Sequence, residues 1–473
     1  MQEESIGRKL NKGVSTIEIL IAFMVLTLCI GAIILITFNN QTSTLDLENH
    51  HEAFMLNQAL WATIQGLDYE NILPCDDAGA VCPGSPSPMF NRKINIHPSQ
   101  ITECAKNIEN ETRWERDLVA LDLKFITRII DTATATALDG DCATTPPNND
   151  WTHPVKLTST DTTQNTLKAT GLDEKNKFVY MSVDPSLAND PDFFIFDNQN
   201  LSTTPIQISS LNTGPGLSSI DIAGSYAYVS NDSKNGQLQI IDISDPHNPT
   251  LTNTLNVVPG GTDINSVGNK VFYYDSKIFL GLKKNNYAEF YVIDATNLNI
   301  LGSYEVGASI NAIYVKNNYA YIATPNTEEL SIVNINPSSF QFMKRVGGFD
   351  APSGSGNGKS LQIIGNTLYL GRTVGNKEFY ILDITDPINP NVLGLYDVNS
   401  SINDLVVVGP YAFLITGTTG AEIQILNISA PENILLIGKF NFADKPTNLD
   451  YADDQIFLSS ENQDALTIIR PKI

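Results

Sequence analysis

The run Tyr226-Ala227-Tyr228, followed by Leu238-Gln239-Ile240-Ile241-Asp242, decides the fold because it recurs along most of the chain. Similar triplets end at Tyr180, Phe279, Tyr321, Tyr369, Phe413 and Phe457, and consecutive copies lie 42 to 51 residues apart. A second apolar run follows each triplet. A period of this length made only of short strands is typical of a β-propeller with one blade per repeat. Seven repeats therefore predict a seven-bladed propeller over residues 150–473.

The last repeat has no third apolar run before Ile473, whereas the earlier repeats have one. A blade without its outer strand would leave an unpaired edge, which proteins avoid. The stretch His153–Thr160 lies before the first complete repeat and matches the missing run. We therefore expect it to pair near Ile468 and close the ring.

Small polar residues precede the triplets, where the inner strand of each blade should line the central channel. They either bond one another around a wet channel, which is the commoner arrangement, or bind a ligand at the channel or rim. The candidates for such a site are Ser219, Asn311, Asn403, Asp404 and Asp450.

The residue patterns predict neither catalysis nor a cofactor. The five histidines lack metal-ligand spacing with Cys, Asp or Glu, so no metal site is predicted. Asp450, Asp453 and Asp454 are more typical of a solvated turn than of a weak cation site. No nucleophile–base pattern is present, and an enzyme of the quinone-cofactor type is the less favoured alternative.

The N-terminal segment has a different character. Arg8, Lys9 and Lys12 precede an uncharged apolar stretch over residues 19–38. As a helix of about 1.5 Å per residue, this stretch is long enough to cross a bilayer. The cations place the N-terminus in the cytoplasm, and Glu18 at the edge of the span needs a partner.

Gly13, Val14 and Glu18 together resemble the N-terminus of type IV pilins and pseudopilins. The resemblance implies that a prepilin peptidase cuts between Gly13 and Val14 and methylates the new amine. Glu18 then pairs with the amine of a neighbouring pilin subunit. The implied location is the cytoplasmic membrane, as a single-pass protein, followed by an extracellular filament at the cell surface.

The predicted organisation follows from these features. Residues 1–13 form the leader, 14–66 a long helix whose first half spans the membrane, and 67–149 a small pilin-like α+β head with a linker. Residues 91–97 and 105–114 are predicted strands. The segment 119–130 fits both a strand and a helix, and we prefer the strand.

Four of the five cysteines, Cys75, Cys82, Cys104 and Cys142, lie between the apolar stretch and the repeats. On the oxidising side of a membrane they indicate two disulfides. Three connectivities are possible, and we lean to Cys75–Cys82 with Cys104–Cys142. Zinc is the rival interpretation, but no CxxC pair is present.

The apolar runs, such as Gln239-Ile240-Ile241-Asp242-Ile243, resemble the LVIVD repeat of bacterial and archaeal surface proteins. The net charge of −23 and the lack of a basic stripe beyond the leader argue against nucleic acid as a partner. We therefore expect a minor or tip filament subunit whose propeller binds an unknown surface ligand in adhesion. A pseudopilin of a secretion or DNA-uptake system is the alternative.

Overall fold

The computed structural model describes residues 24, 44–65, 67, 72–77, 82–83, 89–96, 101–102, 104–116, 119–138, 147, 149–162, 168–185, 189–200, 204–260, 263–326, 328–352, 356–373, 375–442, 445–461 and 465–472. The chain divides into two compact units. The first contains residues 1–95 and 109–126, and the second contains residues 96–108 and 127–473.

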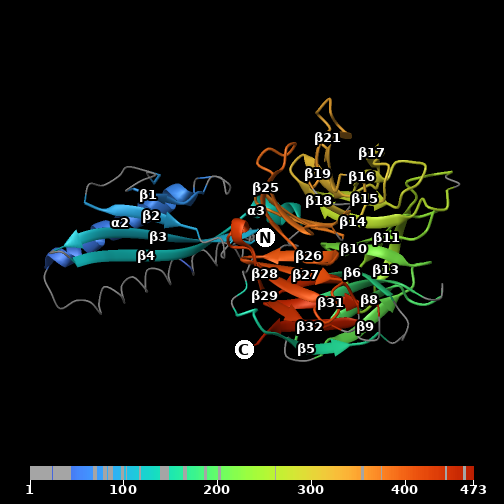
Figure 1. Ribbon diagram of the computed structural model, residues 1–473, viewed down its shortest axis with the longest axis horizontal. Coiled ribbons are helices and arrows are strands. Elements are labelled where there is room, and N and C mark those ends of the chain that lie inside the picture. The colour runs from blue at the N-terminus through green and yellow to red at the C-terminus, as the bar shows by residue number, and fades with distance from the viewer. Residues whose placement is uncertain are drawn as a thin grey trace, which may run out of the picture. The chain divides into compact units, whose positions relative to one another are not determined.

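The second unit holds seven four-stranded antiparallel sheets, the blades of a propeller (Figure 1). The first strands of the blades are β6 (Lys168–Lys175), β10 (Leu217–Ala223), β14 (Gly268–Tyr274), β18 (Ala312–Lys316), β22 (Gly358–Ile364), β26 (Ile402–Val408) and β30 (Pro446–Ala452). The second strands are β7 (Phe178–Asp184), β11 (Tyr226–Asn231), β15 (Lys277–Leu282), β19 (Tyr319–Ala323), β23 (Thr367–Arg372), β27 (Tyr411–Thr416) and β31 (Gln455–Ser460).

The third strands are β8 (Phe193–Asp197), β12 (Leu238–Asp242), β16 (Phe290–Asp294), β20 (Leu330–Asn334), β24 (Phe379–Asp383), β28 (Ile423–Asn427) and β32 (Leu466–Pro471). The fourth strands are β9 (Ile206–Leu211), β13 (Thr250–Leu255), β17 (Ile300–Tyr304), β21 (Lys344–Phe349), β25 (Asn391–Tyr396), β29 (Leu435–Phe440) and β5 (Pro154–Thr160). A 3-10 turn, η3 (Pro431–Asn433), precedes β29, and the helix α3 (Thr132–Ala137) precedes β5.

The ring closes as predicted. Each first strand contacts the first strand of the next blade, and β30 contacts β6. The last blade takes its outer strand from the start of the propeller, because β32 pairs with β5 in antiparallel register (Figure 1). Both the seven blades and the closure by Pro154–Thr160 are confirmed.

The burial of the strands explains their composition. Third strands such as β16 are buried on both faces between neighbouring blades, so nearly every residue is apolar. Fourth strands such as β13 are largely exposed and carry Thr and Asn. The aspartate or asparagine that ends a third strand also has a local role. Its side chain accepts a hydrogen bond from the amide two residues on, as Asp242 does from Ser244 at 2.9 Å.

An acid or amide stands directly before the third strand in six blades, and its side chain accepts a backbone N–H from the segment after the fourth strand. Glu289 Oε2, for example, accepts from Val306 and Gly307, both at 2.9 Å. The six residues are Asp192, Gln237, Glu289, Glu329, Glu378 and Glu422. Part of the acid excess of the chain is therefore structural.

The first unit contains the helix α2 (Thr44–Gln65) and most of a four-stranded sheet of β1 (Cys75–Asp76), β2 (Asn91–Asn95), β3 (Ala105–Arg116) and β4 (Val119–Ile130). Ala53 of α2 packs with Phe90 and Trp114. Asn57 Nδ2 donates to Leu123 O at 3.1 Å. The strand interpretation of residues 119–130 is thus confirmed.

The pilin-like part of the fold prediction is wrong. The structure is nearly all β, and where a long helix was expected over residues 14–66, the helix that can be described is α2, of 22 residues. Residues 19–38, on which the expected length depended, lie outside the described residues apart from Met24. Within α2, Ala53, Leu60 and Ile64 are buried and Glu52 is exposed, as expected for a helix that buries one face on a sheet.

The predicted location must also be corrected. Among the residues that the structure describes, no helix combines the length and the apolar character needed to cross a membrane. The expected single-pass protein of the cytoplasmic membrane, later carried to the cell surface, is therefore not supported.

Candidate functional site: the central pocket

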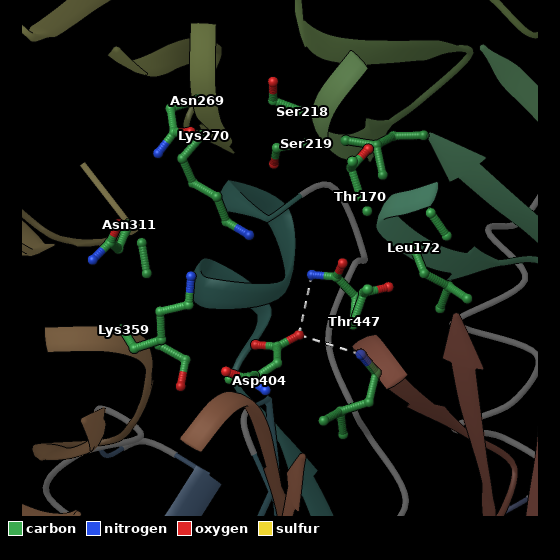
Figure 2. A pocket seen from close by; sticks show the side chains of 18 of the residues that line it. Thr170, Leu172, Ser218, Ser219, Asn269, Lys270, Asn311, Lys359, Asp404 and Thr447 are labelled. Atoms are coloured by element: carbon green, nitrogen blue, oxygen red, sulfur yellow. Dashed lines mark hydrogen bonds between the residues drawn. The ribbon is translucent and has the colours of Figure 1, made fainter. Parts of the chain in front are cut away.

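The central channel of the propeller widens into a pocket of about 910 Å³ where the first strands begin (Figure 2). All seven first strands or the residues just before them contribute to its wall. The ends of several second strands, or the residues just after them, form its rim, among them Asp184, Asp232 and Thr416.

A β-bulge near the start of each first strand except β18 builds this wall. A bulge leaves one residue out of the ladder and re-aims its side chain. In β18, Asn311 just before the strand takes the same position. We call these seven polar residues the bulge ring: Thr170, Ser218, Asn269, Asn311, Lys359, Asn403 and Thr447.

Three members of the bulge ring tie their blade to the next one. Thr170 Oγ1 donates to Leu217 O at 2.6 Å, and Asn269 Nδ2 donates to Ile310 O at 2.6 Å. Asn311 Nδ2 donates to Gly358 O at 2.7 Å. Because the same kind of hydrogen bond recurs in three blades, these members of the bulge ring help to hold neighbouring blades together.

A set of carboxylates lies deeper and links blades in the same way. Asp173 Oδ2 accepts from Ile222 N at 2.7 Å, and Asp450 Oδ2 accepts from Glu174 N at 2.6 Å. Asp221 accepts from the amide of Tyr273. Asp404 Oδ2 accepts from Leu449 N at 3.2 Å and from Asn448 Nδ2 at 3.4 Å, the dashed lines of Figure 2.

Burial shifts the titration of these carboxylates. It raises the pKa of Asp221 to about 7 and that of Asp450 to about 6. Burial, reinforced by the charges of Asp450 and Asp221, raises the pKa of Asp173 well above its ordinary value. The pKa of Asp404 is also raised by burial, although the charge of Lys270 opposes the shift. The floor of the pocket therefore carries less negative charge than its four aspartates suggest.

Two lysines, Lys270 of β14 and Lys359 of β22, extend into the same part of the pocket (Figure 2). Burial lowers the pKa of Lys359, and the charge of Lys270 lowers it further. The lysines of the rim are instead paired, since Lys283 lies 2.7 Å from Asp232 and Lys168 lies 3.3 Å from Glu461.

The structure brings the five predicted channel residues together. Ser219, Asn311, Asn403, Asp404 and Asp450 all line the pocket. Sequence reasoning missed Lys270 and Lys359, because an isolated lysine in a strand pattern indicates a solvated face. An alignment of the seven repeats could have revealed the two lysines, because most of the other repeats have Gly, Ala, Ser, Thr or Asn at these two positions.

The remaining predicted site residues lie elsewhere. Gly13, Val14 and Glu18 are outside the described residues, so cleavage and pairing there stay predictions. Cys75 and Cys82 form the preferred disulfide. Cys104 is buried and disulfide-bonded, whereas Cys142 is outside the described residues, so the pairing of these two stays a prediction.

Comparison with known families supports the repeat assignment. The sequence model of the LVIVD repeat matches residues 217–257, 309–347 and 355–398. The chain carries LVIVD repeats. The three matches fall on the second, fourth and fifth blades, which begin with β10, β18 and β22. No curated protein matches the chain at a significant level.

Solved structures are similar in fold at low identity. A catalytically inactive virginiamycin B lyase from Staphylococcus aureus is 14% identical with a TM-score of 0.50, covering 67% of this chain and 99% of its own. BamB from Moraxella catarrhalis is 13% identical with a TM-score of 0.44, covering 67% and 96%. Sqt1 from Saccharomyces cerevisiae is 12% identical with a TM-score of 0.45, covering 66% and 83%. At these identities, only the first carries an argument, and it concerns the propeller fold alone.

Proposed function

We propose that the propeller is a binding module, not an enzyme, and that its partner docks over the central pocket. The observation that supports this most is the bulge ring, which presents a polar side chain from each of the seven blades to one cavity. Rigid scaffolds commonly bind ligands in such cavities with a few convergent polar groups.

The second part of the proposal concerns the role of the whole chain. A minor or tip filament subunit, or alternatively a pseudopilin, would use the propeller to hold a ligand outside the filament. This part is supported only by Gly13, Val14 and Glu18 in the sequence. A prepilin peptidase and other pilin subunits would then be its partners. N-terminal sequencing of the mature protein should begin at Val14, and any other start overturns this part.

An array of saccharides and peptides, probed with the labelled full-length chain, tests the binding module. Ser218→Trp places a large ring in the pocket without removing any hydrogen bond described above, and should abolish the signals that the unaltered protein gives. Ser338→Trp is the matched control, because Ser338 is exposed in the turn between β20 and β21. The proposal fails if no probe binds, or if Ser218→Trp and Ser338→Trp bind equally well.

A further inference from the structure

Lys270 and Lys359 depart from a pattern that the other blades follow. Lys359 occupies the bulge position, where the other six blades have Thr, Ser or Asn. Lys270 occupies the next position, where the register of the other blades places Gly171, Ser219, Ala312, Ser360, Asp404 and Asn448. In a repeat protein, a residue that the repeat itself does not require points to a role outside the scaffold.

The two ammonium groups also differ from the other lysines of this cavity. Lys270 and Lys359 point toward the same space from either side of Asn311 (Figure 2). Within the described part of the chain, neither ammonium group makes a hydrogen bond or an ion pair, whereas Lys168 and Lys283 at the rim are paired with acids. Two cations that converge in a cavity repel each other, and the charge of Asp404, which attracts both lysines, offsets only part of that repulsion at Lys359.

Neutral polar groups surround the two lysines. Asn269 and Asn311 use their Nδ2 atoms on backbone carbonyls, which leaves each Oδ1 as an acceptor. Ser360, only 3% exposed, also lines the pocket.

The carboxylates that face this space could offer a purely structural reason for the lysines. Lys270 offsets the charges of Asp404 and Asp221. However, Asp404, Asp221, Asp173 and Asp450 each already accept a backbone N–H from the next blade, so they need no lysine as a donor. The like charge of Lys270 disfavours the charged form of Lys359 more than the charge of Asp404 favours it, and Lys168 adds to the repulsion.

We propose that Lys270 and Lys359 bind a carboxylate of an acidic oligosaccharide in the central pocket, while the amide oxygens of Asn269 and Asn311 accept its hydroxyl groups. This inference rests on the proposed binding function and names the ligand class. The pocket, at about 910 Å³, has room for more than one sugar ring. A saccharide suits the wall better than a peptide, because all seven side chains of the bulge ring are polar.

Calorimetric titration of the full-length chain tests the proposal with two matched probes. Cellotriose whose C6 alcohols are oxidised to carboxylates should bind, and cellotriose itself should bind at least about 10-fold more weakly, since charge-assisted hydrogen bonds are the stronger ones. Lys270→Met and Lys359→Met should each weaken the acidic probe about 10-fold or more. Lys359→Arg should retain binding, and Lys439→Met, on the outer strand β29 away from the pocket, should have no effect.

Several results would overturn the inference. It fails if both trisaccharides bind equally, if neither binds, or if the lysine variants keep the affinity for the acidic probe. The proposed ligand class is wrong if inorganic phosphate, or a pentapeptide with a free C-terminus, binds more tightly than the acidic trisaccharide. Loss of array signals in Ser218→Trp together with unaltered binding in Lys270→Met and Lys359→Met would leave the binding module intact and reject the carboxylate site alone.

Discussion

Thr158 of β5 lies directly opposite Ile468 of β32 in an antiparallel ladder. The strand β5, which comes first along the chain in the propeller region, thus completes the last blade, and the ring is closed by strand pairing. Just before β5, Trp151 is fully buried and stacks edge-on against Phe413 at 4.8 Å. Its Nε1 donates to Asp454 Oδ1 at 3.0 Å. The point of closure is therefore anchored on two neighbouring blades.

Trp151→Ala should destabilise the whole ring by about 3–5 kcal/mol, because it leaves a large cavity and removes the hydrogen bond from Nε1 to Asp454. Denaturant unfolding followed by circular dichroism should show one transition at a lower midpoint. Phe340→Ala is the control, since Phe340 is 85% exposed and its loss should change little. An unchanged midpoint for Trp151→Ala would show that closure does not hold the ring together.

Glu289→Ala should lower the free energy of unfolding by about 1–3 kcal/mol, because it leaves the amides of Val306 and Gly307 without their acceptor. Glu289→Gln should cost much less, since Gln237 fills the same position in another blade and its Oε1 accepts from Val257 N at 2.9 Å. Urea unfolding of both variants checks this. Equal losses for Ala and Gln would mean that the negative charge matters and not the acceptor oxygen.

Arg372 and Glu329 form an ion pair between two blades, with side chains 0% and 1% exposed. Arg372→Met should lower the free energy of unfolding by about 3–5 kcal/mol, because it leaves a buried carboxylate without its cation. Adding Glu329→Gln should restore much of the stability, since the amide keeps an acceptor for Ala351 N. The double-mutant cycle is measured by thermal unfolding, and simple additivity of the two substitutions would contradict the pairing.

The stability of the propeller should fall as the pH rises from about 5 to 8. Burial raises the pKa of Asp221 to about 7, from an unfolded value near 4. The folded state therefore keeps a proton that the unfolded state loses, so this contribution is complete below about pH 4 and is lost as the pH rises through 7. Glu174 and Asp450, with pKa values raised by burial to about 7 and about 6, act in the same direction.

Asp221→Asn should flatten this pH profile, because the amide oxygen still accepts from Tyr273 N and no longer titrates. Urea midpoints at several pH values would show it. Asp245→Asn serves as the control: hydrogen bonds from the Asn248 side chain and the His247 amide lower the pKa of Asp245, so it titrates below this range. A profile for Asp221→Asn as steep as that of the unaltered protein would rule out Asp221 as a source.

The repeat made the propeller predictable. Triplets such as Tyr226–Tyr228 and runs such as Leu238–Asp242 are short, apolar and periodic, and the aspartate that ends a run makes a local turn. Ring closure was predictable because the last repeat lacks its third apolar run and the stretch before the first repeat supplies one. The long helix did not follow: the apolar stretch over residues 19–38 led to the prediction of a helix over 14–66, whereas the described helix, Thr44–Gln65, has 22 residues.

The site was only partly predictable. Ser219 and Asn403 were placed in the channel because they precede the triplets, which requires only the order of the strands. The roles of Lys270 and Lys359 depend on the bulges that set the register of β14 and β22. A bulge depends on packing between blades, so a single repeat does not reveal it.

Lysine footprinting tests the central claim, that the pocket is where the propeller binds, most directly. The full-length chain is reductively methylated with and without a saturating ligand taken from the array, and each lysine is quantified by mass spectrometry. We predict that Lys270 and Lys359 are protected several-fold, while Lys344 and Lys439 on the outer strands β21 and β29 react as before. Protection of the outer lysines with unchanged reactivity of Lys270 and Lys359 would place the binding surface elsewhere and contradict the account.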